Sequence, residues 1–549
     1  MIKKQVLLFL LIIVTASVSV FGCKDSDDNK KPSMIININE FVHESSFDVA
    51  GKKSDDYEYS NELNIIDDNY RNYYEIFVRS FNDSDDDGIG DLNGVTQKLD
   101  YLEELGVTGI WLMPINPSKT YHKYDVDDYY EIDSSYGTMD DLENLLEEAE
   151  KRDINIIMDL VINHSSTSNY WFSQAYNAVV NGDLDNKYIE YYNIKKGSSS
   201  TYYRIGSTDY YYEAYFWDQM PDLNMDCESL REEIKDIAKF WLEKGVSGFR
   251  VDAAMHIYGQ ANDDKNIEFW TWFVDYCKTV KEDVFVVGEI WSNSEKISKY
   301  YQSDMSVFNY YLGGPSLGTS GSYIRAAIIE NEAKSIVKSI TDWQRKLKGI
   351  NQDAIDSNFL TNHDNARSAG QLRKNIYAIK FAAALYLMAP GASFTYYGEE
   401  IGMMGSGKDE NFRAPMYWSY NEESITDPPP NMDEVKHFFP AVDVQTQYTN
   451  LIYSTYKRAF GLRNENPEIA RGNTELINIG EDFGAYTSTY NDSTVIIIHN
   501  ITTKPQTVKL SKSKIGYSEI RGYLNPTGEK FFIQGEEFTF PAYATLILK

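Results

Sequence analysis

The stretch Gly248-Phe249-Arg250-Val251-Asp252-Ala253-Ala254-Met255-His256 ends a short apolar run and places an arginine and an aspartate two residues apart. Alternate side chains of a β-strand share a face, so Arg250 and Asp252 point the same way at the end of the strand. A guanidinium beside a carboxylate keeps that carboxylate ionised and oriented. This suits a nucleophile better than a proton donor. A buried structural ion pair would have the same pattern, so the neighbouring segments must decide.

Strand-like and helix-like patterns alternate around this stretch. Other strand-like segments end in the same kind of chemistry, with Asn163 and His164, with Glu289, and with His363 and Asp364. Repeated strand-helix units imply a parallel sheet, and this many in one domain favour a closed eight-fold barrel. In such barrels the reactive groups lie where the strands end. The predicted fold class is therefore α/β, a (β/α)8 TIM barrel.

Changes in composition predict the domain boundaries. Segment 165–225 is rich in Gly, Ser, Asn and Tyr without clean helical periodicity, which predicts an irregular subdomain inserted after the third strand. Short β-rich runs over 474–549 predict a C-terminal antiparallel β-domain, a β-sandwich. The catalytic barrel then spans 65–164 and 226–473. The predicted strands beside the central one are 73–81, 107–113, 154–161, 284–288, 355–360 and 392–397, and the predicted helices are 93–105, 139–152, 229–245, 267–280, 372–388 and 451–462.

The N-terminus has the pattern of an export signal. Residues 1–22 combine a basic start with a long apolar run, which predicts a signal peptide that is removed. The ending Val20-Phe21-Gly22-Cys23 resembles the bacterial lipobox, in which the cysteine is lipidated. Residues 23–64 are polar and rich in charge, which predicts a flexible acidic tether. We expect membrane attachment through a lipid on Cys23 at the bacterial cell surface, in the outer membrane if the cell is Gram-negative.

Composition excludes some partners. The 549 residues carry a formal net charge of −31, which argues against nucleic acid but not against a neutral sugar. Three cysteines are too few for a disulfide framework. Two buried free thiols at Cys227 and Cys277 are favoured over a bridge, although the sequence leaves the pairing open.

The segment Asp83-Ser84-Asp85-Asp86-Asp87-Gly88-Ile89-Gly90-Asp91 follows the first predicted strand. Oxygen ligands at Asp83, Asp85, Asp87 and Asp91, with the backbone carbonyl of Ile89, have the spacing by which an EF-hand loop binds a hard cation. The last EF-hand ligand is missing, because Gly94 stands in place of glutamate. A solvated acidic loop is the alternative. Five aspartates in nine residues repel one another without a cation, so we predict a Ca²⁺ site.

Five segments taken together resemble the α-amylase family, glycoside hydrolase family 13, over residues 70–549. Their order and spacing agree with that family. The chain is also similar to bacterial surface lipoprotein amylases of starch-utilisation systems, although its insertion is too short for the extra starch-binding module of some members. The segments are Asp159-Leu-Val-Ile-Asn163-His164, Met220-Pro-Asp-Leu-Asn224, Gly248 to His256, Gly288-Glu289-Ile290-Trp291 and Phe359-Leu-Thr-Asn-His363-Asp364.

The resemblance implies catalytic roles for three carboxyl groups. Asp252 would be the nucleophile, Glu289 the general acid and then base, and Asp364 the stabiliser of the distorted sugar. Glu289 needs a raised pKa, which neighbouring apolar groups can supply by desolvation. Two carboxyl groups so used lie about 5–5.5 Å apart and give retention of configuration. Substrate contacts are implied for Tyr124, His122, Asp125, His164, Arg250, His363 and Arg367.

The resemblance also implies a second calcium site at Asn163, Asp222 and the carbonyl of His256. Many calcium-dependent members have lysine just before that histidine, whereas this chain has Met255. The departure leaves the occupancy of the second site open.

The leading function is hydrolysis of internal α-1,4-glucosidic bonds in starch, maltodextrin and related α-glucans, with retention. Ala253 after the nucleophile resembles α-1,4-cleaving members, whereas α-1,6-cleaving relatives often carry valine there. The segment Met220 to Asn224 is shared with neopullulanase-like relatives, so mixed neopullulanase or oligo-1,6-glucosidase specificity stays open, as does transglycosylation. A non-catalytic glucan-binding protein is disfavoured because all three acidic residues are present. We expect a monomer that works with other glucan-uptake proteins.

Overall fold

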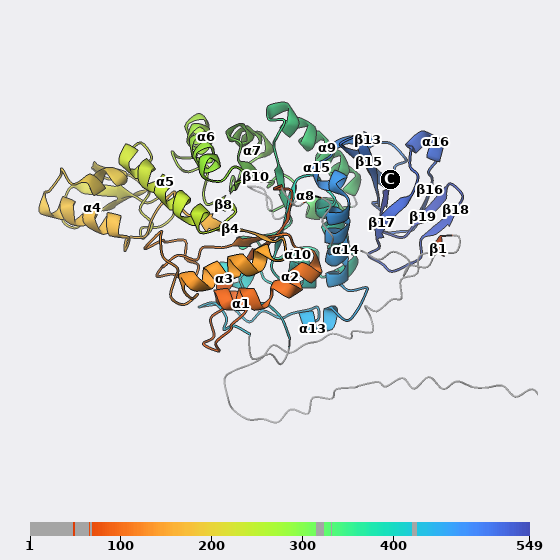
Figure 1. Ribbon diagram of the computed structural model, residues 1–549, viewed down its shortest axis with the longest axis horizontal. Coiled ribbons are helices and arrows are strands. Elements are labelled where there is room, and N and C mark those ends of the chain that lie inside the picture. Colours follow the sequence, from red (N-terminus) through yellow and green to blue (C-terminus); the bar gives the residue numbers. More distant parts are fainter. Residues whose placement is uncertain (1–47, 50–64, 66–67, 315–322, 331, 420–424) are drawn as a thin grey trace, which may run out of the picture.

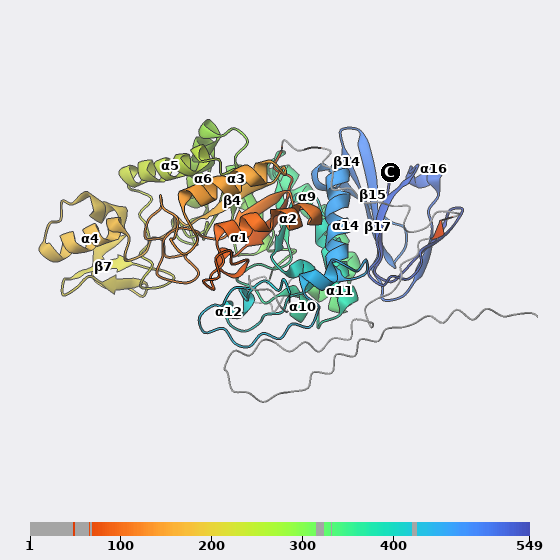
Figure 2. The ribbon, with the colours of Figure 1, turned by 60° about the horizontal axis from the view of Figure 1, so that its bottom comes forward.

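The computed structural model describes residues 48–49, 65, 68–314, 323–330, 332–419 and 425–549. The predicted signal peptide, Cys23 and almost all of the predicted tether lie outside these residues. Figure 1 shows a central barrel with the inserted subdomain at one end and the C-terminal strands at the other, and Figure 2 shows the same order from a second direction. Within the described ranges, no helix combines the length and the apolar character needed to cross a bilayer.

Eight parallel strands close the barrel, and the last of them pairs with the first through Phe394 and Tyr73. The interior is filled with aromatic rings, since Tyr73 stacks on Phe394 at 4.7 Å and on Phe285 at 5.2 Å. Strands buried on both faces are typical of parallel barrels. In chain order the strands are β2 (Asn72–Ile76), β3 (Gly109–Leu112), β4 (Asn155–Leu160), β8 (Gly248–Val251), β9 (Phe285–Gly288), β10 (Ser306–Phe308), β11 (Asp356–Phe359) and β12 (Ala392–Tyr396).

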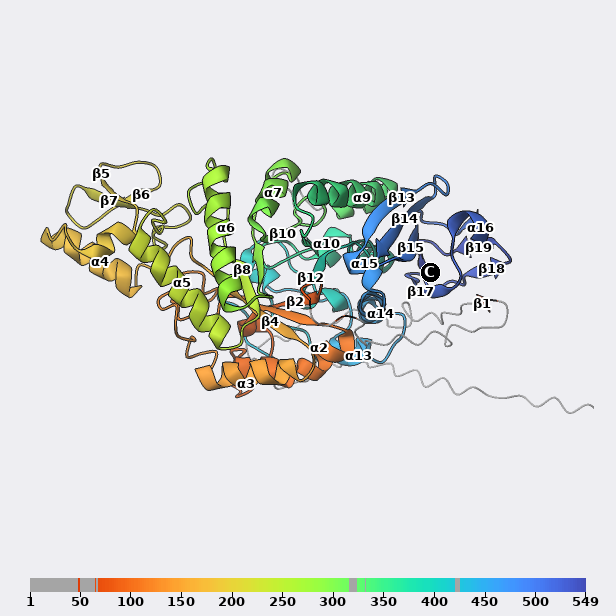
Figure 3. The same ribbon diagram turned by 45° about the horizontal axis from the view of Figure 1, so that its top comes forward.

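Helices surround the barrel, as Figure 3 shows. The helix over Met139–Glu150 begins with a capping box in which Thr138 and Asp141 each accept a hydrogen bond from the other's backbone N–H, which stabilises its first turn. The helices are α1 (Leu92–Gln97), α2 (Leu99–Leu105), α3 (Met139–Glu150), α5 (Glu228–Glu243), α6 (Asp263–Val280), α7 (Ser294–Tyr300), α8 (Tyr323–Glu330), α9 (Ala333–Ile350), α10 (Ser368–Gln371), α11 (Ile376–Leu387), α12 (Asp409–Phe412), α13 (Val442–Gln445), α14 (Ile452–Glu465) and α15 (Pro467–Arg471). Short 3-10 turns are η3 (Val78–Ser80), η4 (Lys187–Tyr191), η5 (Tyr301–Ser303) and η6 (Glu399–Ile401).

The inserted subdomain follows β4, the third barrel strand, and is more regular than the sequence indicates. It consists of α4 (Tyr170–Asn181) and an antiparallel sheet of β5 (Ile194–Lys196), β7 (Tyr210–Glu213) and β6 (Tyr202–Arg204). Asn169 caps the start of α4, and Gly182 ends it with a φ of +75°, a conformation that glycine adopts at little cost.

The C-terminal domain has a hydrophobic core of its own, which includes Phe483, Phe538 and Leu546. Two sheets contribute to this core. The closed barrel and these C-terminal antiparallel sheets confirm the predicted fold class. Residues 48–49 of the predicted tether join one of its edges. One sheet contains β13 (Asn473–Ile477), β14 (Phe483–Tyr490), β15 (Ser493–Asn500), β20 (Thr545–Leu548) and β17 (Ile520–Leu524), and the other contains β1 (Asp48–Val49), β18 (Phe532–Gln534), β19 (Glu537–Phe540) and β16 (Gln506–Lys509), with α16 (Lys512–Ile515) beside them.

Several elements differ from those expected from the sequence. The first predicted strand, 73–81, ends at Ile76 and is followed by the 3-10 turn Val78–Ser80. The sixth barrel strand, β10, is not among the predicted strands because it has three residues. The helix expected over 93–105 is divided at Lys98 into α1 and α2, and α9 was not predicted. Cys227 and Cys277 are buried and free.

Candidate active site

A pocket of about 260 Å³ opens at the carboxyl ends of the barrel strands and brings the three predicted catalytic side chains together. Asp252 directly follows β8, and Glu289 directly follows β9. Asp364 lies in the loop after β11. Parallel strands all end at the same face of a barrel, so residues far apart in the sequence meet there. The pocket is also lined by Tyr124, His164, Phe216, Met220, Ala253, Met255, His256 and Trp291.

The guanidinium of Arg250 binds three carboxyl groups at the base of the pocket. It donates to Asp252 at 2.7 Å, to Glu289 at 2.8 Å and to Asp159 at 3.0 Å. The side chain of Arg250 is only 1% exposed, so these charge-assisted hydrogen bonds form out of water, where they orient carboxylates strongly. Burial raises the pKa of Asp159 to about 7 even though Arg250 opposes the shift. One cation thus fixes the carboxyl groups of Asp252 and Glu289 relative to each other.

Glu289 has the electrostatic setting of a proton donor. Burial raises its pKa, and the negative charges of Asp252 and Asp364 add to the effect against the opposing Arg250. The backbone N–H of Ala253 donates to the Glu289 carboxyl at 3.2 Å. Ala253 has a φ of +47°, a conformation that costs energy in a residue other than glycine and that recurs at active sites. A carboxyl whose pKa is raised holds its proton to higher pH and is better suited to act as a general acid.

Asp364 has the opposite setting. Burial alone would raise its pKa, but the neighbouring His363 and Arg413 cations outweigh burial and hold its pKa well below the usual range. Arg413 donates to Asp364 at 2.8 Å, and His363 Nε2 lies 3.1 Å from the same carboxylate. Burial lowers the pKa of His363, but Asp364 and Glu75 outweigh it and raise the pKa to about 9. Asp364 therefore stays ionised beside a charged histidine.

The structure corrects the prediction that Arg367 contacts substrate. Its guanidinium is buried and donates to the backbone carbonyls of Phe412 and Tyr397. It therefore supports the turn before Arg413 and does not line the pocket. Arg413, which sequence reasoning missed, is the arginine beside Asp364. It lies beyond the short helix α12, and nothing in the local pattern around it indicates which carboxylate it pairs with.

The other predicted substrate residues divide into two groups. Tyr124 and His164 line the pocket, and the Tyr124 hydroxyl lies 2.7 Å from His363 Nε2. His164 Nε2 is buried without a partner among the described residues, so a ligand hydroxyl would satisfy it. His122 and Asp125 are not among the lining residues. His122 Nδ1 accepts from the Tyr124 backbone N–H, and Asp125 accepts from Ser118 at 2.6 Å, so both shape the loop that carries Tyr124.

Comparison with known proteins agrees with this geometry. The family model for the alpha amylase catalytic domain matches residues 75–472. The chain belongs to the α-amylase family of glycoside hydrolases. A second model, for the C-terminal domain of alpha-amylase SusG, matches residues 484–547.

Individual members of the α-amylase family are similar over nearly the whole chain. Alpha-amylase 3 of Dictyoglomus thermophilum is 39% identical, over 87% of this chain and 93% of that protein. A glucan 1,6-alpha-glucosidase of Streptococcus pneumoniae is 30% identical, over 79% of this chain and 91% of that protein. Among solved structures, Eubacterium rectale Amy13B has a TM-score of 0.85 and 37% identity, over 89% of this chain and 97% of that one.

An exposed run of aromatic residues, Tyr215, Phe216 and Trp217, borders the pocket of this α-amylase family member. The three side chains are 48%, 47% and 45% exposed. Phe216 lines the pocket and lies 4.9 Å from the ring of His256. Such rings cost free energy in water and stack well on the apolar faces of sugars. Sequence reasoning missed this run, whose only signal is three aromatic residues just before Met220.

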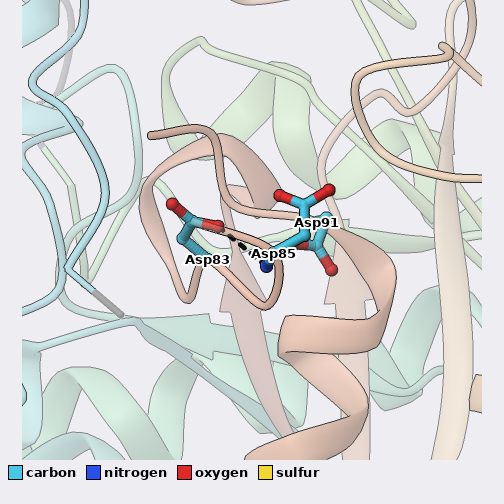
Figure 4. A group of neighbouring side chains, drawn as sticks. All are labelled: Asp83, Asp85 and Asp91. Atoms are coloured by element: carbon cyan, nitrogen blue, oxygen red, sulfur yellow. Dashed lines mark hydrogen bonds between the residues drawn. The ribbon is translucent and has the colours of Figure 1, made fainter. Parts of the chain in front are cut away.

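The acidic loop between β2 and α1 gathers three of its five predicted ligands. Ligand oxygens of Asp83, Asp85 and Asp91 all lie within 4.8 Å of one another. Figure 4 shows the three side chains on this loop. Asp83 accepts from the backbone N–H groups of Gly88 at 2.7 Å and of Asp85 at 3.1 Å. Desolvation and the charge of Asp87 raise the pKa of Asp85. No basic side chain forms a salt bridge with these three carboxylates among the described residues, so the donor set fits a hard cation.

Asp87, a fourth predicted ligand of this loop, does not join the three. The carboxylate of Asp87 accepts instead from the backbone N–H of Ile89 at 2.7 Å.

The residues of the second predicted calcium site also meet. Asn163, Asp222 and His256 line one cavity of about 220 Å³, together with Glu213. Burial and the charge of Glu213 raise the pKa of Asp222 to about 7, and its Oδ1 is buried without a partner among the described residues. An unsatisfied buried carboxylate oxygen is costly, so this oxygen donor set also fits a hard cation.

Proposed function

We propose that the protein is a retaining endo-hydrolase of α-1,4-glucosidic bonds in starch, maltodextrin and related α-glucans. The observation that carries the proposal is the pairing of two carboxyl groups on one guanidinium, with Arg250 at 2.7 Å from Asp252 and 2.8 Å from Glu289. A nucleophile and an acid that share a single donor group are close enough for double displacement, the mechanism of retaining enzymes.

The residues suggest a reaction in two steps. Glu289 gives its proton to the glycosidic oxygen while Asp252 attacks the anomeric carbon, so the carbon–oxygen bond breaks and a glycosyl ester forms. Glu289, now ionised, takes a proton from water, and that water displaces Asp252 to restore the original configuration. Asp364, held ionised by His363 and Arg413, would accept hydrogen bonds from sugar hydroxyls and so favour the distorted ring.

Cleavage within a chain is supported by the exposed aromatic run. Tyr215 and Trp217 are about half exposed, beside a pocket of about 260 Å³. Rings at such an edge can stack on sugar units beyond the one that reacts. An enzyme that removes single terminal units would not need a platform outside the pocket.

Mixed specificity is the second candidate, and a relative favours it. The relative from Streptococcus pneumoniae, 30% identical, is a glucan 1,6-alpha-glucosidase. The two specificities are separated by assaying amylose, pullulan and isomaltose side by side and following the anomeric proton of the first product by NMR. We expect α-configured products from amylose and little turnover of isomaltose. Turnover of isomaltose alone, or β-configured first products, would reject the proposal. Products longer than the substrate would indicate transglycosylation instead.

We also infer that Ca²⁺ binds the acidic loop through Asp83, Asp85 and Asp91, and that the cavity of Asn163, Asp222 and His256 holds a second ion. An ion in the loop would neutralise its repelling carboxylates and stiffen the connection between β2 and α1.

We propose further that the mature chain begins at a lipid-modified Cys23 and lies on the bacterial cell surface. The support is the sequence pattern of residues 1–23. Metabolic labelling with a radioactive fatty acid should label the wild type and not Cys23→Ser. Protease treatment of intact cells should remove the protein, and its survival would contradict surface exposure.

A further inference from the structure

A groove of about 560 Å³ lies between the first turn of α11 and three loops of the C-terminal domain. No lining residue of the groove lines the catalytic pocket. In a (β/α)8 barrel each outer helix begins at the face where the strands end, so the groove lies toward the catalytic face. The polar and aromatic side chains that line the groove are those of Asn375, Tyr377, Thr503, Thr527, Glu529 and Tyr543.

Tyr543 is strained. Its φ is +60°, which is unusual for a bulky residue and costs about 1–3 kcal/mol. The ring stacks on Phe381 with centroids 4.8 Å apart, and the Tyr543 backbone N–H donates to Thr502 at 3.1 Å. Glycine would occupy this conformation without strain. A tyrosine kept there is consistent with a side chain that serves a ligand.

The groove offers neutral hydrogen-bonding groups beside aromatic rings. The hydroxyls of Tyr377, Tyr543 and Thr503 have no hydrogen-bond partner among the described residues. Asn375 uses its carbonyl oxygen to cap α11, accepting from Tyr377 at 3.0 Å, and its amide N–H groups remain available. Glu529 is the one charged residue in the lining. Rings with uncharged donors and acceptors suit a neutral polyol better than an anion or a purely apolar ligand.

We propose that this groove is a second, non-catalytic binding site for an α-glucan chain. The choice of α-glucan rests on the proposed function. A polymer held there would stay beside the catalytic face after each cleavage, which raises the effective concentration of the remaining chain. Tyr377 would stack on a sugar face, while Asn375, Thr503 and the hydroxyl of Tyr543 would bind sugar hydroxyls. Tyr543 itself is 8% exposed, and its ring packs on Phe381.

The test removes the ring of Tyr377 and the hydroxyl of Tyr543 without touching the catalytic pocket. Tyr377→Ala and Tyr543→Phe are combined in a Glu289→Gln background, where polymer is not consumed, and retardation is measured in gels that contain amylopectin. Tyr543→Phe keeps the ring that packs on Phe381, so the fold should survive, and thermal unfolding checks this. Retardation should weaken about tenfold. Phe532→Ala, which removes a ring 56% exposed elsewhere in the same domain, is the matched control and should change nothing.

Two further arms make the outcome decisive. With intact Glu289, the double variant should hydrolyse p-nitrophenyl maltotrioside at the wild-type rate and amylopectin more slowly. Unchanged retardation would overturn the proposal, and so would an equal loss with Phe532→Ala. Gels with cellulose derivatives test the ligand class, and equal retardation there would overturn the α-glucan assignment. If the protein fails to cleave α-1,4-glucans, the proposed function falls, while retardation still decides the groove.

Discussion

Two clusters of carboxylates in this protein are neutralised in different ways. At the ends of the barrel strands, Arg250 and Arg413 bind the carboxylates from within the chain. In the loop of Asp83, Asp85 and Asp91, the carboxylates accept mainly from backbone N–H groups, and no basic side chain forms a salt bridge with them among the described residues. The first cluster is balanced by its own cations. The second needs a cation from solution, so the two should respond to different perturbations.

The largest expected effect is on the rate. Glu289→Gln removes the exchangeable proton while keeping the shape of the side chain, so kcat should fall by about 10³-fold or more. The amide keeps the size of the side chain, and thermal unfolding checks that the variant is folded. Glu282→Gln, an exposed carboxylate seven residues earlier, is the control and should keep full kcat. Equal kcat values for the two variants would reject the role of Glu289.

The second effect separates the clusters by stability. Arg250→Met leaves buried carboxylates without their cation, which should cost about 3–5 kcal/mol in the free energy of unfolding. The measurement is urea denaturation at neutral pH. Arg345→Met removes an exposed arginine that pairs with Asp342, and its cost should stay below about 1 kcal/mol. If the two costs match, the role of Arg250 in binding these carboxyl groups is wrong.

The third effect is the dependence of stability on pH in the catalytic cluster. His363 has a folded-state pKa of about 9, above the usual 6.5, so the folded protein holds this proton more tightly than the unfolded chain. The resulting stabilisation, roughly 3 kcal/mol, is complete below about pH 6.5 and is lost as the pH rises through 9. The stability difference between wild type and His363→Asn should therefore shrink over this range. A difference that is constant from pH 6 to pH 10 would contradict a charged His363.

The smallest effect belongs to the acidic loop. A chelator should lower the melting temperature of the wild type by about 1–2 °C, corresponding to a loss of about 1–2 kcal/mol in a chain of this length, and added Ca²⁺ should restore it. Asp83→Asn should show a smaller response, whereas Asp209→Asn, an exposed aspartate elsewhere, should respond like the wild type. Any response that persists in Asp83→Asn and vanishes when Asp222→Asn is added would come from the second cavity. If the chelator leaves the melting temperature of the wild type unchanged, both calcium proposals are wrong.

Much of the fold and of the catalytic pocket was predictable because it depends on local order. Asp252 and Glu289 each follow a short apolar strand, and the ends of parallel strands converge at one face whatever the loops do. Features that depend on distant loops were not predictable in this way. Arg367 was expected at the substrate, but Arg413 occupies the position beside Asp364, because the direction of a long guanidinium side chain is decided by the loops that pack around it.

The sequence by itself determined the alternation of strands and helices, the three acidic residues at strand ends and the acidic loop, since each is written in the spacing of neighbouring residues. Tertiary structure alone decided that one buried guanidinium joins Asp252 and Glu289, and that three of the four carboxylates predicted as loop ligands converge. It also decided that α11 and the C-terminal loops enclose a groove. The ion pairs of Arg250 and the walls of the groove depend on distances between segments that are far apart in the chain. The spacing of residues within one segment does not determine these distances.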